Sequence, residues 1–137
     1  MMLQKLPTFL KENNAKLLIK YDGERNFKKY TIRIFFDEAE RRNVGCDTDS
    51  PYAIFKELFN GNDFFEEEMS ELFMNNINVG IETLKDKFGD ESIISVIMNE
   101  KDSCVLYTIH IQTEKGTKYL SDTSYKQLYQ TMLLNEI

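Results

Sequence analysis

Two pairs of strand-like segments constrain the fold of this chain more than any other feature. The first pair covers residues 16–21 and 28–36, and the second covers residues 92–98 and 103–113. Apolar residues alternate along the first pair on either side of an Asp-Gly turn signal, and β-branched side chains fill the second pair around a short polar turn. Each pair therefore predicts an antiparallel hairpin.

Apolar residues recur at helical spacing in four other segments, which are residues 3–13, 51–60, 64–88 and 125–133. Capping residues precede the last three: Ser-Pro before the second, Asp with Glu three residues later at the third, and Ser with Gln at the fourth. The Asn-rich stretch 75–80 is a poor helix former and predicts a kink or split in the long third helix.

The order of these elements predicts an α+β fold, in a single domain spanning residues 1–137. We expect an antiparallel sheet of four or five strands, built from the two hairpins and a short strand at 118–120, with three or four helices on one face. Residues 37–49 lack periodicity and predict a long loop or a short irregular strand. A chain of this length buries roughly 65–70% of its unfolded surface, which is enough for its own core.

Cysteine and histidine are too scarce for several kinds of site. Cys46 and Cys104 are 58 residues apart and fit neither a disulfide framework nor a zinc site. We expect both thiols to be free, with Cys104 buried as a small hydrophobe. His110, the single histidine, follows Cys104 by six residues on one strand, about 20 Å away, so the two cannot form a catalytic pair. We expect His110 at an edge or rim of the sheet.

Sequence signatures of catalysis are also missing. The six glycines are dispersed, so no phosphate loop is present, and the nucleophile elbow, the zinc-protease motif and the EF-hand loop are absent. Asp47 and Asp49 form the one dense carboxylate pair in a loop, which could hold Mg²⁺ through oxygen ligands, although capping of the next helix by Asp49 explains it as well. We therefore predict no catalytic residue, no cofactor and no metal site.

The net charge of −6 hides a strong segregation along the chain. Residues 1–36 carry +5, whereas residues 37–71 carry −8. Within the acidic block, Asp63, Glu67 and Glu71 follow at helical spacing on the face opposite the apolar stripe. Acidic residues at a helix start are also favoured by the helix dipole, so a merely solvated face is the alternative.

We interpret the acidic block as a surface that docks on a basic protein partner by electrostatic steering. Aromatic side chains nearby would supply desolvated anchors. The predicted partner-binding residues are Asp47, Asp49, Tyr52, Asp63, Phe64, Glu67, Glu68 and Glu71.

In size, acidity and lack of catalytic signatures, the chain resembles the bacterial immunity proteins that neutralise toxins, and the phage-encoded inhibitors of host defence. This resemblance implies a non-enzymatic protein that binds and blocks a basic partner, either a toxin or a host effector. The order of helices and strands is similar to that of type III secretion effector chaperones, which implies a dimeric chaperone as one alternative. A small-molecule enzyme with a carboxylate-based site is the other.

The composition also bears on where the protein acts. No apolar run approaches the roughly 18–20 residues of a membrane span, and no export signal is visible, so we expect a cytoplasmic protein without membrane contact. Direct nucleic-acid binding is disfavoured because it needs a dominant basic footprint. The oligomeric state stays open, with a monomer favoured.

Overall fold

The computed structural model of this protein describes residues 6–36, 44–49 and 67–135. Its helices are α1 (Leu6–Glu12), α3 (Glu67–Phe88) and α4 (Tyr125–Leu134). Its strands are β1 (Ala15–Asp22), β2 (Tyr30–Phe36), β3 (Val44–Thr48), β4 (Ile93–Lys101), β5 (Cys104–Thr113) and β6 (Gly116–Asp122). The expected α+β class is confirmed.

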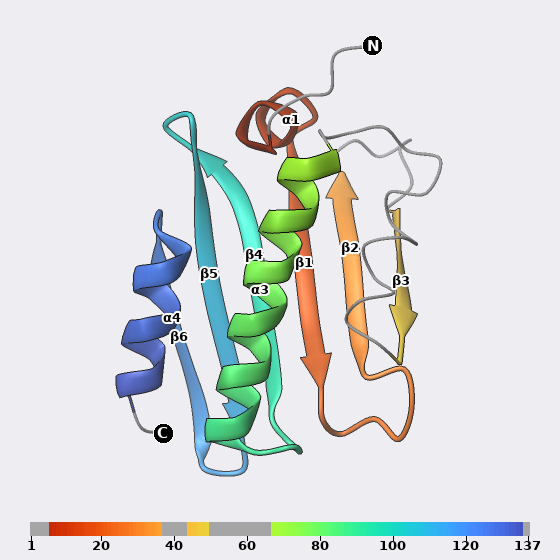
Figure 1. Ribbon diagram of the computed structural model, residues 1–137, viewed down its shortest axis with the longest axis vertical. Helices are drawn as coiled ribbons and strands as arrows, with labels where there is room; N and C mark the ends of the chain where they lie inside the picture. Colours follow the sequence, from red (N-terminus) through yellow and green to blue (C-terminus); the bar gives the residue numbers. More distant parts are fainter. Residues whose placement is uncertain (1–5, 37–43, 50–66, 136–137) are drawn as a thin grey trace.

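The strands form one antiparallel sheet in the order β3-β2-β1-β4-β5-β6 (Figure 1). Both expected hairpins form, and they join through β1 and β4, where Ile19 lies opposite Val96. Among the described residues the sheet has six strands rather than four or five. The difference arises because residues 44–48 form a strand that pairs along β2, inside the segment expected to be a long loop or a short irregular strand. The short strand expected at 118–120 is also present and pairs with β5 over residues 116–122.

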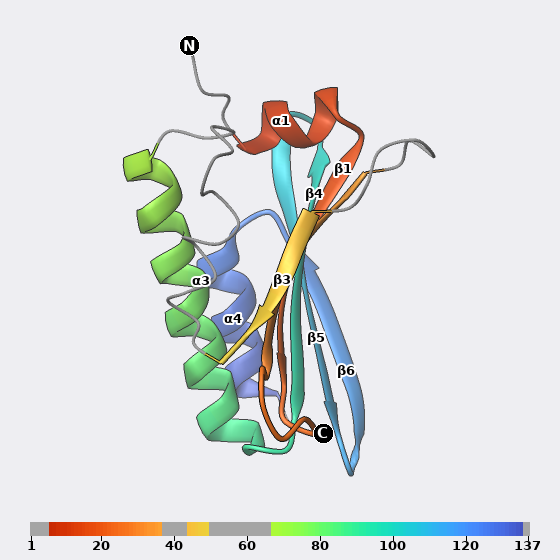
Figure 2. The same cartoon turned by 90° about the vertical axis from the view of Figure 1, so that its right-hand side faces the viewer.

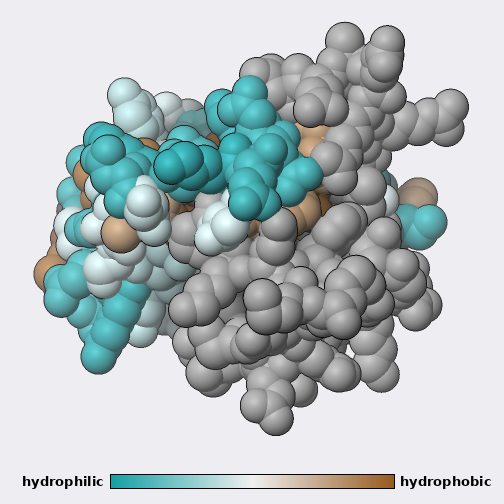
Figure 3. Space-filling model, turned by 90° about the horizontal axis from the view of Figure 1, so that it is seen from above, coloured by the Kyte–Doolittle hydropathy of each residue, from teal (hydrophilic) through white to brown (hydrophobic). Residues whose placement is uncertain are grey.

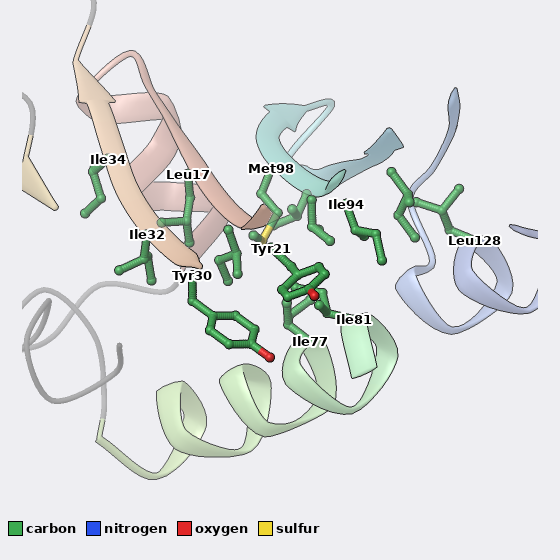
Figure 4. Close-up of a cluster of buried hydrophobic side chains, with 14 of the residues drawn as sticks. Leu17, Tyr21, Tyr30, Ile32, Ile34, Ile77, Ile81, Ile94, Met98 and Leu128 are labelled. Atoms are coloured by element: carbon green, nitrogen blue, oxygen red, sulfur yellow. The ribbon is translucent and has the colours of Figure 1, made fainter. Parts of the chain in front are cut away.

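Helices α3 and α4 cover one face of this sheet, and α1 lies across one end of it (Figure 2). Alternate residues of the inner strands face these helices, so that Leu17, Ile19 and Ile94 are at most 1% exposed. Helix α3 contributes Ile77, Ile81 and Leu84, and α4 contributes Leu128 and Met132 to the same core. Figure 4 shows side chains of the two layers pointing toward one another.

Helix α3 is continuous from Glu67 to Phe88, so the expected kink or split at residues 75–80 is wrong. Gly80 instead allows α4 to approach closely, because a Cβ atom at this position would lie 2.9 Å from Cζ of Tyr125. The Tyr125 hydroxyl donates a hydrogen bond to the carbonyl of Ile77, at 3.2 Å. Gly80 thus lowers the helix propensity of this stretch, but it permits the contact with Tyr125 that holds α3 against α4.

Two expectations about β5 are also wrong. Cys104 is exposed rather than buried, because it immediately follows the turn of the β4–β5 hairpin. Asp102 and Ser103 in this turn have φ angles of 52° and 66°, as a two-residue type I′ hairpin turn requires. His110 lies on an inner strand, between Ser95 of β4 and Tyr119 of β6, because β6 extends the sheet past it.

The helix expected at residues 51–60 and the first residues of the helix expected at 64–88 lie outside the described part of the chain. In the part that is described, no helix combines the length and apolar character that a membrane crossing requires.

Candidate protein-binding surfaces

Asp47, one of the predicted partner-binding residues, lies on β3 and is held by three side chains of this chain. The Thr31 hydroxyl donates a hydrogen bond to its Oδ1 atom at 2.5 Å. Arg25 Nη1 and Arg33 Nη2 lie 3.5 and 3.8 Å from the same oxygen. The hydrogen bond from Thr31, assisted by the charges of the two arginines, lowers the pKa of Asp47. Its negative charge is therefore largely matched within the chain.

Asp49 connects the end of β3 to the loop between β1 and β2. Its Oδ1 atom accepts a hydrogen bond from the backbone N–H of Lys28, at 2.5 Å. Lys28 has a φ angle of 51°, and the carboxylate holds this left-handed backbone in place. One oxygen of Asp49 is thus used to join two segments of the fold.

The other predicted partner-binding residues are only partly described. Glu67, Glu68 and Glu71 lie in the first turns of α3, where Glu67 and Glu71 are one turn apart on the same face. Figure 2 shows these turns standing further from the sheet than the C-terminal half of the helix. The structure does not describe the side chains of these three glutamates. It also does not describe Tyr52, Asp63 and Phe64.

The sheet face away from α3 and α4 is a second candidate surface, which the sequence analysis missed. No helix among the described elements covers it (Figure 2). On this open face Phe35 is 37% and Tyr119 is 71% exposed, and Leu18 and Ile97 are half-buried. The sequence did contain a signal for this face: apolar residues also occupy the strand positions that alternate with the buried ones. The open face includes Lys16, Leu18, Lys20, Arg33, Phe35, Ile97, Leu106, Thr108, His110 and Tyr119.

Some basic side chains on and beside the open face form ion pairs with carboxylates of the described residues, and others do not. Lys20 Nζ lies 3.6 Å from Asp22 Oδ2, and Arg25 Nε lies 3.3 Å from the same atom. Arg33 pairs with Asp47, as described above. Lys16, in contrast, is exposed and has no carboxylate partner among the described residues. Lys16 thus places a positive charge without a carboxylate partner in the described ranges at the end of the face that α1 occupies.

A hollow of about 750 Å³ opens at this end of the sheet, and we call it the α1 hollow. Its apolar lining includes Leu10, Leu18, Phe35 and Ile97, and its polar lining includes Lys11, Asn14, Lys16, Asn99 and Glu100. Figure 3 looks down on this end of the molecule and shows hydrophobic side chains between hydrophilic ones.

A cluster of titratable groups lies on the opposite face of the sheet, beneath α3. The Tyr30 hydroxyl donates to Glu82 Oε1 at 2.6 Å, and the Tyr21 hydroxyl donates to the carbonyl of Asp90 at 2.5 Å. Lys85 Nζ lies 5.0 Å from the centre of the Tyr21 ring. Burial, followed by the hydrogen bond to Glu82, raises the pKa of Tyr30. Both tyrosines are therefore neutral donors: Tyr30 joins the sheet to α3, and Tyr21 joins it to the segment that follows α3.

Within the described ranges, no three His, Cys, Asp or Glu side chains are grouped so that they could hold a metal ion. Comparison with protein-family models, with curated proteins and with solved structures finds no match to this chain.

Proposed function

We propose that this chain is a non-enzymatic protein that binds a basic protein partner and blocks it, as a bacterial immunity protein blocks a toxin or a phage protein inhibits host defence. The observation that carries this proposal is the charge of −8 within residues 37–71, against +5 in the residues before them. Such a concentration of carboxylates raises the rate of encounter with a basic surface.

The carboxylates of the acidic block differ in whether other groups of the chain already bind them. Asp47 is paired with two arginines, and Asp49 is bonded to the loop before β2, so neither offers a wholly free carboxylate. Glu67, Glu68 and Glu71 at the start of α3 are therefore the carboxylates on which the partner would dock.

Reversal of charge at Glu67 and Glu71 tests this proposal. The tagged double variant Glu67→Lys/Glu71→Lys and the wild type are used to recover partners from the native cell, and each eluate is analysed at several salt concentrations. Asp86→Lys is the control for position, because it reverses the charge of one exposed acid in the C-terminal part of the same helix.

We expect the wild type and the Asp86→Lys variant to recover one basic protein at about equal stoichiometry, and moderate salt to release it. The double variant should recover much less of it while keeping its circular dichroism spectrum. Equal recovery by all three proteins would show that the start of α3 is only a solvated surface.

A further inference from the structure

We propose that the α1 hollow is a second docking site, which binds an extended acidic segment of another protein through one apolar anchor side chain. This inference does not depend on the acidic surface, because it concerns residues of opposite charge at a different place on the molecule.

The floor of the hollow is suited to an apolar side chain. Leu18 of β1 and Ile97 of β4 are directly opposite each other on the open face and are both half-buried. Phe35 of β2 remains 37% exposed beside them. Covering this floor would remove apolar surface from water, which is the main favourable term in association.

The rim of the hollow carries positive charge that no carboxylate in the described part of the chain pairs with. Lys11 at the end of α1 and Lys16 at the start of β1 are exposed, and neither has a carboxylate partner among the described residues. Glu100 also lines the hollow, where its Oε1 atom accepts the backbone N–H of Ser103 at 2.8 Å, and the two lysines outnumber this one carboxylate. Charge complementarity therefore favours an occupant with carboxylates near its apolar anchor.

The openness of the hollow favours a protein segment over a small molecule. Pockets for small ligands bury roughly 70–90% of the ligand surface, which requires enclosing walls. Here the two lysines and Phe35 remain exposed to solvent, so a ligand would be covered on one side only. An extended segment needs only such a one-sided contact, because a single side chain enters the hollow while the rest of the segment stays in contact with water.

Peptide selection provides the test. A random peptide library displayed on phage is selected on the immobilised protein, and the recovered peptides are synthesised with a fluorescent label. Their dissociation constants are measured by anisotropy for the wild type and for Lys11→Glu/Lys16→Glu. The matched control is Lys115→Glu/Lys126→Glu, which makes the same charge change at exposed positions in the β5–β6 turn and on α4.

We expect the recovered peptides to combine Asp or Glu with Leu, Ile or Phe. Their affinity should fall at least tenfold in Lys11→Glu/Lys16→Glu and less than twofold in the control. Ile97→Ser should weaken binding as well, and the lysine variants still decide the question if Ile97→Ser does not fold.

Three results would overturn the inference. The first is the absence of acidic, apolar peptides among those recovered, and the second is affinity unchanged by the lysine replacements. The third is a different occupant: saturable binding of decanoate in the hollow without peptide binding, or self-association of the wild type that Lys11→Glu/Lys16→Glu abolishes. Because the acidic surface is tested with Glu67→Lys/Glu71→Lys, either proposal can fail while the other stands.

Discussion

Replacement of Gly80 by alanine tests the contact between α3 and α4 on which the helical layer depends. The added Cβ atom would overlap the Tyr125 hydroxyl and lie 2.9 and 3.2 Å from Cζ and Cε1 of the ring. Overpacking of this kind costs about 1–3 kcal/mol, and losing the hydrogen bond to Ile77 costs about 0.5–1.5 kcal/mol more. Alanine recovers about 1 kcal/mol of helix propensity, so we expect a net loss of about 1–3 kcal/mol of folding free energy.

Urea denaturation followed by far-UV circular dichroism measures this loss. With a typical slope of about 1–3 kcal/mol per molar urea, the midpoint for Gly80→Ala should fall by about 1 M. Val79→Ala is the control, because Val79 is 63% exposed on the same helix and its replacement should change stability by about 0.5 kcal/mol or less.

A double-mutant cycle separates the clash from other effects. Tyr125→Phe removes the hydroxyl that the new Cβ atom would meet, so Gly80→Ala should cost at least about 1 kcal/mol less in the Tyr125→Phe background. If Gly80→Ala is instead neutral or stabilising in the wild type, the close approach of α4 to α3 described here is refuted.

The remaining predictions concern the tyrosine cluster, a tight turn and the Asp47 network. Tyr30→Phe should lower the free energy of unfolding by about 1 kcal/mol, because Glu82 loses a part-buried hydrogen-bond donor, and an unchanged urea midpoint would contradict this. Gly23→Ala should destabilise the fold by about 1–3 kcal/mol, because the added Cβ atom would lie 2.6 Å from the backbone carbonyl carbon of Glu91. A variant with the same thermal unfolding midpoint as the wild type would contradict this close packing. Because the folded-state pKa of Asp47 is lowered, its ionised form stabilises the fold above its unfolded pKa of about 3.9, and this stabilisation is lost as the pH falls through the folded value. Asp47→Asn should therefore reduce stability at neutral pH and flatten its pH dependence below about pH 4, and equal urea midpoints for both proteins at neutral pH would count against the network.

Local patterns predicted much of the fold. The alternation of Leu17, Ile19 and Tyr21 predicted the buried face of β1, and the same alternation predicted that of β2. The Ser124 cap predicted the start of α4, where its side chain accepts the backbone N–H of Gln127. These signals are local, since side chain and backbone partners lie within a few residues of one another.

The errors arose where distant segments decide the outcome. The join between β1 and β4 brings together strands about 75 residues apart in sequence, and no local pattern encodes it. Gly80 predicted a weak helix because propensity cannot show that Tyr125 packs against it. Cys104 and His110 were misplaced because their exposure depends on a turn and on the extent of a neighbouring strand.

The candidate surfaces were predicted less completely than the fold. Charge counting identified the acidic block, but it could not show that Arg25 and Arg33 match the charge of Asp47. The open face was missed because its apolar residues are interleaved with lysines and arginines along the strands. Which of these residues lack a partner becomes visible only when the sheet is assembled.

We propose that carboxylates at the start of α3 attract a basic protein. The most direct measurement is the association rate constant with the recovered partner across an ionic-strength series, for the wild type, Glu67→Lys/Glu71→Lys and Asp86→Lys. At low salt we expect the double variant to associate about tenfold more slowly than the wild type, with a weaker salt dependence, and Asp86→Lys to behave as the wild type. Equal rates and equal salt dependence for all three proteins would contradict it.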